Sequence, residues 1–248
     1  MNIAVIVAGG VGARTGQSIP KQFINVGDKP IIIYTMERFQ KHPKIDAIEV
    51  VCLEGWLIPI ISYAKQFGID KLKWTVPGGN TVQESLYNGI MNLKKVCSDE
   101  DIVVIHDGVR PFVSAELVSN LLDTCRSKGN ACTSQMFTEQ IFFTDNHPDY
   151  SSKFVDRSSI RIVQTPQAYR FVDAVNVYEQ AFESGQGLQP GSYINTTMVD
   201  FGYTLYLVPG VSDNIKITTK SDIELFKVLL RQEKAEAQSG NEDANDNI

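Results

Sequence analysis

Short apolar runs alternate with stretches of helical period along most of the chain. The apolar runs predict strands at residues 2–8, 47–53, 73–77, 101–106 and 203–208. The helical periods predict helices at residues 30–41, 58–67, 81–93, 114–128, 171–183 and 221–232. Strands that alternate with helices in this way are typical of a mostly parallel sheet with helices on both faces. The pattern therefore predicts an α/β fold with a Rossmann-like sheet.

The alternation changes in the second half of the chain. Residues 131–145 and 153–164 have the pattern of two strands, and a polar loop at 145–152 joins them. We interpret residues 137–164 as a protruding β-arm, which is either a lid or a surface that pairs with another subunit. Residues 1–232 are expected to form a single domain. The acidic tail 233–248 has almost no large apolar residue and is predicted to be disordered.

The overall charge of the chain limits its partners. Its 248 residues carry a formal net charge of −6 at pH 7, so no excess of cations is present for general binding of nucleic acid. The sequence shows no apolar stretch long enough to cross a membrane and no signal-peptide pattern, and we expect a cytoplasmic protein without a membrane partner. The four cysteines form no C-x-x-C pair, which predicts buried, reduced thiols and no zinc site.

The first predicted strand runs into a glycine turn, Gly9-Gly10-Val11-Gly12, and two cations follow, Arg14 and Lys21. Glycines let backbone N–H groups point outward at the end of a strand, where they can bind phosphate. The turn lacks the Gly-Lys-Ser/Thr of a Walker loop, and Thr15 stands where a dinucleotide fingerprint has its third glycine. A lone Arg or Lys is usually a solvated surface charge. Two of them beside such a turn can stabilise the charge that develops during phosphoryl transfer.

Five motifs in order resemble one known family. The segments Ala8–Arg14 and Pro20–Phe23 are similar to the signature of the 2-C-methyl-D-erythritol 4-phosphate cytidylyltransferases and of their relatives, the ribitol-5-phosphate cytidylyltransferases. The other motifs are Gly78-Gly79 with Ser85, His106–Phe112, Gln164–Gln167 and Asp213–Thr218. The match extends from residue 2 to about residue 230. The resemblance implies a nucleotidyltransferase sheet with the β-arm described above.

The resemblance also implies the chemistry. A substrate phosphate attacks the α-phosphorus of CTP, pyrophosphate leaves, and Mg²⁺ neutralises the triphosphate. The implied catalytic residues are Arg14, Lys21, Arg157 and Lys216. The implied nucleotide-binding residues are Ala8, Gly9, Gly10, Gly12, Gly79, Asn80 and Ser85. In relatives the arm crosses to a second subunit and delivers the residue matching Arg157, so the resemblance implies a homodimer.

The acceptor side is expected to contain Asp107, Arg110 and Thr165. As a carboxylate at the end of a predicted strand, Asp107 can cap the following turn, bind Mg²⁺ or bind a substrate hydroxyl. Arg110 can pair with Asp107 or contact the substrate. Thr165 either donates to the substrate phosphate or simply ends a strand before Pro166.

The chain departs from the family pattern mostly on this acceptor side. Glu139-Gln140 stands where the erythritol enzymes have Asp-Thr, and Ser192–Asn195 stands where they have Thr-Asp-Glu-Ala. Val82 replaces an expected Arg. We therefore add Gln140 and Ser192 to the candidate substrate residues, and infer that the nucleotide chemistry is kept while recognition of the acceptor has changed.

The first-named function is transfer of CMP from CTP to a polyol phosphate, with 2-C-methyl-D-erythritol 4-phosphate as the first acceptor, in isoprenoid biosynthesis. A competing interpretation is an enzyme for ribitol 5-phosphate or another polyol or sugar phosphate, in synthesis of a surface polymer. A sugar nucleotidyltransferase that uses UTP or GTP would share the glycine-rich opening. A nucleotide-binding domain without turnover would explain the substituted acceptor side.

Overall fold

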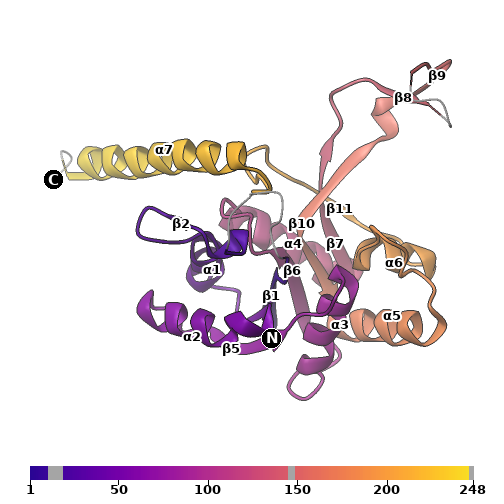
Figure 1. Ribbon diagram of the computed structural model, residues 1–248, viewed down its shortest axis with the longest axis horizontal. Coiled ribbons are helices and arrows are strands. Elements are labelled where there is room, and N and C mark those ends of the chain that lie inside the picture. The colour runs from indigo at the N-terminus through magenta and orange to yellow at the C-terminus, as the bar shows by residue number, and fades with distance from the viewer. Residues whose placement is uncertain (11–18, 145–148, 246–248) are drawn as a thin grey trace.

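A seven-stranded sheet crosses the molecule in the order β11-β7-β10-β6-β1-β4-β5 (Figure 1). The computed structural model describes residues 1–10, 19–144 and 149–245, with side chains as far as Glu236. The strands of the sheet are β1 (Asn2–Ala8), β4 (Ala47–Cys52), β5 (Leu72–Pro77), β6 (Ile102–Asp107), β7 (Asn130–Met136), β10 (Arg161–Arg170) and β11 (Leu207–Pro209). Among these strands, β10 is antiparallel to its neighbours and the other pairings are parallel. The predicted α/β fold with a mostly parallel sheet is confirmed.

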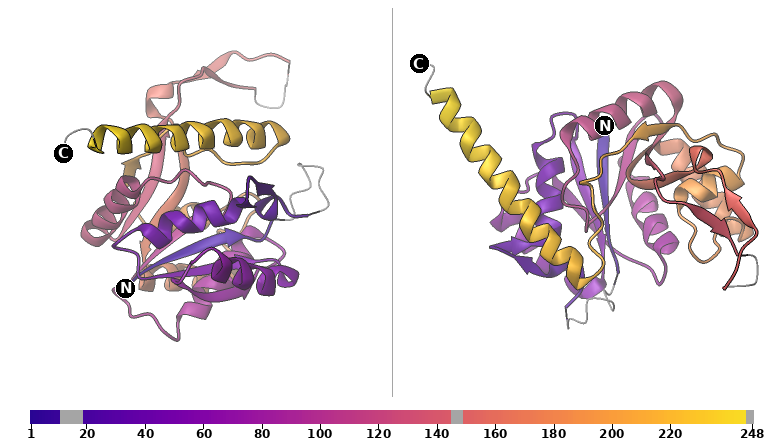
Figure 2. Two further views of the ribbon diagram at one scale, coloured as in Figure 1. Left: turned by 90° about the vertical axis from the view of Figure 1, so that its left-hand side faces the viewer. Right: turned by 90° about the horizontal axis from the view of Figure 1, so that it is seen from above.

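Helices cover both faces of this sheet (Figure 2). One face packs against α1 (Ile31–Lys41), α2 (Leu57–Gln66) and α4 (Ala115–Lys128). The opposite face packs against α3 (Val82–Leu93), α5 (Phe171–Ser184) and α6 (Ile194–Asp200). Along β1, Ala4 and Ile6 enter the first core, whereas Ile3 and Val5 enter the second. Because successive side chains of a strand alternate between faces, a strand that is apolar throughout needs a helical layer on each side.

Local signals set the ends of several helices. The Thr81 hydroxyl accepts a hydrogen bond from the Glu84 N–H at the start of α3, and Ser114 does the same for Leu117 at the start of α4. Gly129 closes α4 with a φ of 94°, a conformation that glycine adopts without steric cost. The sequence did not predict α6. Residues 194–200 are too short and too rich in Asn and Thr to stand out by helical period.

The predicted β-arm is confirmed. Strands β7 and β10 run past the edge of the sheet and end in a small ribbon of β8 (Ile141–Phe143) and β9 (Lys153–Val155), which projects from the body in Figure 1. A short 3₁₀ turn, η4 (Arg157–Ser159), follows β9. The apolar side chains of the ribbon, such as Phe142 and Phe154, are largely exposed.

The C-terminal segment differs from the prediction of a disordered tail after residue 232. Helix α7 runs from Lys220 to Asn245 and extends outward from the body (Figure 1). Residues 232–237 are Gln, Glu, Lys, Ala, Glu and Ala, which are all good helix formers. Glu233 also pairs with Arg38 of α1 at 2.6 Å, so the helix has a tertiary contact beyond the predicted boundary.

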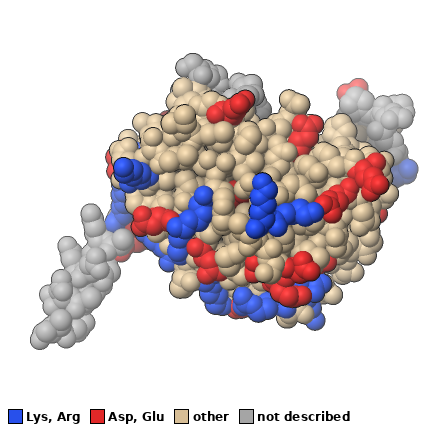
Figure 3. Space-filling model, turned by 90° about the horizontal axis from the view of Figure 1, so that it is seen from below, with Lys and Arg blue, Asp and Glu red and all other residues tan. Residues whose placement is uncertain are grey.

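The described residues include no helix that is both long and apolar enough to cross a bilayer. On the face that Figure 3 shows, basic and acidic side chains intermingle over the described surface. The four cysteines are free thiols, and Cys52, Cys125 and Cys132 are buried as predicted, whereas Cys97 is half-buried. Burial raises the pKa of the Cys52 thiol to about 11, so it stays protonated at neutral pH.

One buried acid lies in the core beneath α3. Glu49 on β4 is fully buried, and its Oε2 accepts a hydrogen bond from Asn92 Nδ2 at 2.7 Å, whereas Oε1 has no partner among the described residues. Burial raises the pKa of Glu49 to about 8, and the hydrogen bond from Asn92 opposes the rise only in part. The Glu49 carboxyl is therefore protonated at neutral pH in the folded protein.

We expect Glu49→Gln to make the protein less sensitive to alkaline pH. In the wild type the unfolded chain loses the Glu49 proton above about pH 4.5 and the folded chain keeps it up to about pH 8. The contribution of this group to the free energy of unfolding therefore falls with rising pH in that window, by about 1.4 kcal/mol per unit at most. Urea unfolding at pH 5 and pH 8 should show a smaller pH difference for Glu49→Gln than for wild type. The exposed control Glu183→Gln should behave like wild type, and equal pH differences in all three proteins would contradict the assignment.

Candidate active site

A cavity of about 390 Å³ lies at the carboxyl ends of β1, β4 and β5, where ligands bind in open α/β sheets. Its lining consists of Val7, Gly9, Gly10, Leu53, Gly79, Asn80, Thr81, Val82 and Ser85. Five of the predicted nucleotide-binding residues thus meet in one place, although they come from two separate glycine segments. Gly12 and the catalytic candidate Arg14 lie outside the described residues.

Ser85, in the first turn of α3, is bonded to the second glycine segment of this cavity and packs closely against the first. Its Oγ accepts a hydrogen bond from the Gly79 N–H at 3.0 Å and donates one to the Thr81 carbonyl at 2.8 Å. A Cβ atom added at Gly78 would lie 3.0 Å from this Oγ, and one added at Gly9 would lie 3.2 Å from it. The two backbones can approach this closely only because both residues lack a side chain.

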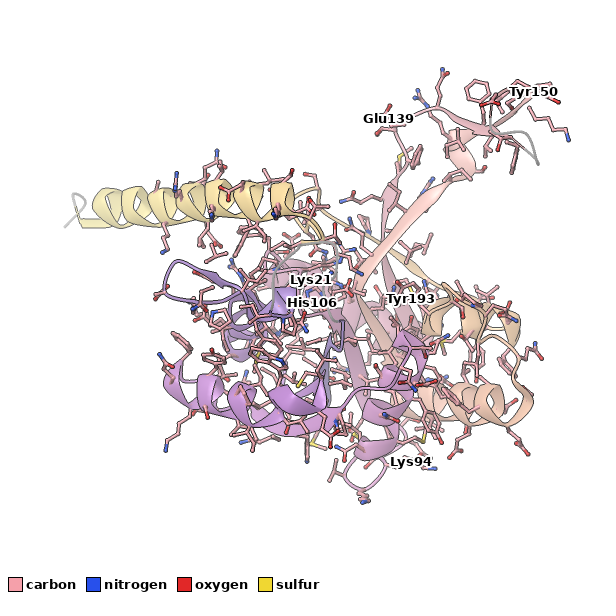
Figure 4. All side chains as sticks on the ribbon, viewed as in Figure 1. Lys21, Lys94, His106, Glu139, Tyr150 and Tyr193 are labelled. Atoms are coloured by element: carbon pink, nitrogen blue, oxygen red, sulfur yellow. The ribbon has the colours of Figure 1, made fainter. Side chains whose placement is uncertain are left out.

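Gln22 holds the first glycine segment in place through hydrogen bonds to its backbone. It is buried in the 3₁₀ turn η2 (Lys21–Phe23), and its Nε2 donates to the carbonyls of Ala8 at 2.6 Å and Gly10 at 3.0 Å. The ring of the next residue, Phe23, stacks on the ring of Trp56 at a centroid distance of 4.0 Å. This turn carries Lys21, which Figure 4 marks in the middle of the molecule near His106 in the same view. Sequence reasoning used Gln22 only as part of a motif and missed its positioning role.

A second cavity, of about 160 Å³, adjoins the first, because Val7 and Val82 line both. Asp107 also lines it, and the parallel register pairs Val7 of β1 with Asp107 of β6. The Asp107 carboxylate accepts hydrogen bonds from Lys216 Nζ at 3.1 Å and Arg110 Nε at 2.9 Å. Thr165 Oγ1 on β10 also donates to it at 3.2 Å. Burial by itself would raise the pKa of Asp107, but attraction from Lys216 and Arg110 outweighs burial and lowers this pKa to about 2.

Backbone contacts fix Arg110, one of the two cations at Asp107. Arg110 Nη1 donates to the Asn214 carbonyl at 2.7 Å, and Asn214 Nδ2 donates to the Thr165 carbonyl at 2.7 Å. The imidazole of His106 lies 3.0 Å from the Arg110 carbonyl through Nε2. Burial lowers the pKa of His106 to about 4, so the ring is neutral at pH 7 and acts as a support. The predicted grouping of Asp107, Arg110, Thr165 and Lys216 is thus present as one cluster.

The metal role predicted for Asp107 does not fit this geometry. Both of its carboxylate oxygens accept hydrogen bonds from Lys216, Arg110 or Thr165. The described residues contain no group of three or more His, Cys, Asp or Glu side chains that could hold a metal ion. We therefore assign Asp107 the role of orienting two cations, and derive no step through a metal held by this carboxylate.

Two predicted residues, Arg157 and Gln140, lie far out on the β-arm. They line a cavity of about 410 Å³ on the arm itself together with Phe142 and Phe154, and Arg157 Nη1 donates to the Thr138 carbonyl at 2.6 Å. Because the arm points away from the sheet (Figure 1), a single chain does not bring these residues to Asp107 and Lys216.

Ser192 differs from its predicted role as a substrate residue, because it does not belong to the described lining of either central cavity. Its Oγ donates to the Gly187 carbonyl at 3.0 Å and the Gln189 carbonyl at 2.6 Å, and so closes a loop. Its neighbours Tyr193, Ile194 and Asn195 line the cavity of Asp107 instead. Part of the segment 192–195 thus lines the cavity, but the register of α6, which decides which side chain faces inward, could not be read from the sequence.

Comparison with known proteins identifies the family of this chain. Residues 2–232 match the family model described as 2-C-methyl-D-erythritol 4-phosphate cytidylyltransferase. The chain is 46% identical to the ribitol-5-phosphate cytidylyltransferase of Lacticaseibacillus paracasei, over 94% of this chain and 99% of that protein. It is 32% identical to the 2-C-methyl-D-erythritol 4-phosphate cytidylyltransferase of Clostridium botulinum, over 93% of this chain and 98% of that protein.

A solved structure gives the same answer for the fold. The 4-diphosphocytidyl-2C-methyl-D-erythritol synthase of Anaerococcus prevotii superposes with a TM-score of 0.78 at 25% identity and covers 93% of this chain and 96% of that one. The glycine-lined cavity and the cation cluster beside it thus occur in a chain that matches this family over nearly its whole length. The chain belongs to the 2-C-methyl-D-erythritol 4-phosphate cytidylyltransferase family and is a nucleotidyltransferase enzyme of the cytidylyltransferase class.

Proposed function

We propose that this enzyme transfers CMP from CTP to ribitol 5-phosphate with release of pyrophosphate. The observation that carries the proposal is the pair of adjoining cavities, one lined by glycine backbone and the other by the cations Lys216 and Arg110. The relative with 46% identity is named for ribitol 5-phosphate, whereas the relatives named for methylerythritol phosphate are near 32%. This similarity favours ribitol 5-phosphate over methylerythritol phosphate, the acceptor that we name first from the sequence.

In the proposed reaction, CTP occupies the glycine-lined cavity and the acceptor phosphate occupies the cavity of Asp107. An oxygen of the acceptor phosphate attacks the α-phosphorus, a new P–O bond forms there, and the bond to the β-phosphate breaks as pyrophosphate leaves. Lys216 holds the attacking phosphate, Asp107 fixes the Lys216 ammonium in place, and Arg110 pairs with the same carboxylate. Lys21, and Arg14 outside the described residues, are the proposed cations for the triphosphate. Such a reaction depends mainly on positioning and on cations, and needs little covalent help from the protein.

Mg²⁺ remains part of the proposal as a partner of the triphosphate. Magnesium in such sites is bound largely by substrate phosphates and water with one or two carboxylates, and the described residues contribute no cage of their own. When bound, the ion neutralises charge on the phosphates. The cytoplasmic location stays a prediction from composition.

The β-arm is proposed to complete the site of a second copy. Arg157 and Gln140 lie on an arm whose Phe142 and Phe154 are 55% and 75% exposed, and an exposed apolar surface of this kind marks an interface. In a homodimer each arm would bring its Arg157 to the acceptor phosphate of the other subunit.

The test is a pyrophosphate-release assay with CTP, Mg²⁺ and a panel of acceptors. We expect the highest kcat/KM with ribitol 5-phosphate. A higher kcat/KM with 2-C-methyl-D-erythritol 4-phosphate would show that this compound, which the sequence analysis names first, is the acceptor. Turnover with UTP or GTP in place of CTP would favour a sugar nucleotidyltransferase. Binding of CTP without release of pyrophosphate in the presence of any acceptor would contradict an enzymatic role.

A further inference from the structure

Asn195 presents an unused hydrogen-bonding group in the acceptor cavity. It lies in the first turn of α6 and is only 8% exposed, yet it belongs to the cavity lining. Its Oδ1 is buried and has no hydrogen-bond partner among the described residues. A buried polar atom left without a partner costs free energy, and such atoms in native proteins call for an explanation.

Hydrogen bonds to α3 hold the chain on both sides of Asn195 in place. Gln83 of α3 donates from Nε2 to Thr197 Oγ1 at 2.8 Å and to the Gly187 carbonyl at 3.2 Å. Its Oε1 accepts a hydrogen bond from the Tyr178 hydroxyl at 2.9 Å. These contacts tie both ends of the loop before α6 to α3. Asn195 is therefore presented in a fixed place, as a preorganised binding group is.

The rest of the cavity indicates what Asn195 would bind. Lys216 and Arg110 can hold a phosphate, and Val82, Leu86 and Ile194 form apolar walls that suit a carbon chain. The acidic side chain in the described lining, Asp107, is already paired with both cations. Figure 4 marks Tyr193, two residues before Asn195, on the α6 side and His106 on the β6 side. The α6 side therefore offers a neutral acceptor without a free carboxylate, which suits a hydroxyl better than an ammonium group.

We propose that Asn195 determines acceptor specificity by accepting a hydrogen bond from a hydroxyl on one of the two chain carbons of the acceptor that lie furthest from its phosphate. This inference rests on the proposed function and names the residue that reads the polyol. Because hydroxyl recognition depends on individually placed polar partners, loss of one partner discriminates between acceptors that carry the hydroxyl and acceptors that lack it.

The test compares Asn195→Ala and the near-isosteric Asn195→Leu with wild type on two acceptors. Ribitol 5-phosphate has the full chain, whereas sn-glycerol 3-phosphate has the phosphate but a chain shorter by two carbons. We expect kcat/KM to fall about 10- to 100-fold with ribitol 5-phosphate, as for a hydrogen bond of about 1.4–3 kcal/mol. We expect less than about a threefold change with sn-glycerol 3-phosphate and an unchanged Kd for CTP. The surface control Asn176→Ala on α5 should match wild type with both acceptors.

The outcomes separate this inference from the proposed function. Equal losses with both acceptors, or no loss with ribitol 5-phosphate, would overturn the role of Asn195 while leaving the cytidylyltransferase reaction intact. A preference of wild type for ethanolamine phosphate over the polyol phosphates would also overturn it. Wild-type enzyme that releases no pyrophosphate with any acceptor would overturn the proposed function first and this inference with it. Asn195→Leu roughly keeps the side-chain volume. If the alanine variant does not fold, the two acceptors can therefore still be compared with Asn195→Leu.

Discussion

Replacing Lys216 by Met is expected to lower kcat/KM by about three orders of magnitude, the effect typical of removing one preorganised donor from a developing charge. Lys216 Nζ lies 3.1 Å from Asp107 and lines the acceptor cavity. Met keeps most of the apolar stem and removes only the ammonium. Without the ammonium, the Asp107 carboxylate remains and the attacking phosphate loses a cation. The activation barrier of the transfer therefore rises more than the binding of CTP weakens.

Steady-state pyrophosphate release and separate titration with CTP measure this effect. Lys227→Met is the matched control, because Lys227 lies on the surface of α7 and pairs with Glu224 at 2.7 Å. The lowered pKa of Asp107, about 2, keeps its carboxylate ionised above pH 4. The stabilisation from this ion cluster is present above the ordinary pKa of 3.8 and is lost only as pH falls toward 2. A loss below tenfold in Lys216→Met would remove Lys216 from the reaction.

Arg157→Ala is expected to lower kcat/KM by about a hundredfold if the arm of one subunit completes the site of the other. A single variant cannot show which subunit supplies the arginine. Mixing inactive Arg157→Ala with inactive Lys216→Met can show it, because a mixed dimer holds one site with an intact Lys216 and an intact arm. With random exchange, half of the dimers are mixed and each has one complete site, so about a quarter of the wild-type activity should return.

The matched control for this experiment is a mixture of two differently tagged preparations of Arg157→Ala. Every arm in that mixture lacks Arg157, so no complete site forms. Failure of the first mixture to regain activity, with subunit exchange verified by size-exclusion chromatography of tagged chains, would refute the shared site. Equal recovery in both mixtures would also refute it.

Much of the fold could be predicted because it depends on local patterns. The runs at 2–8 and 101–106 are apolar on both faces, and only the interior of a covered parallel sheet accommodates such strands. The predicted strand at 153–164 is less accurate, since β10 begins at Arg161 and continues to Arg170. Its antiparallel pairing with β6 and β7 depends on how the chain returns from the arm, which hydrophobic period does not reveal.

The candidate site also has one part that the sequence motifs predicted and one part that they did not. The motifs placed Asp107 and Lys216 in one cluster although 109 residues separate them, and this succeeded because both belong to segments that resemble one family. Ser192 and Asn195 are only three positions apart, and the motif could not tell which faces the cavity. That choice depends on the turn of α6 against Gln83, Thr197 and the loop at Gly187, all of them contacts between distant segments.

Sequence alone thus determined the chemistry that is available: the covered sheet, the glycine turn at the end of its first strand, and the cations that later motifs add. Tertiary structure alone decided which groups meet. It paired Asp107 with Lys216 and Arg110 rather than leaving its carboxylate open, it turned Asn195 inward, and it set Arg157 on an arm outside its own site. The physical reason is that period and composition act through neighbours along the chain, whereas the direction of a side chain is settled by packing against residues far away in sequence.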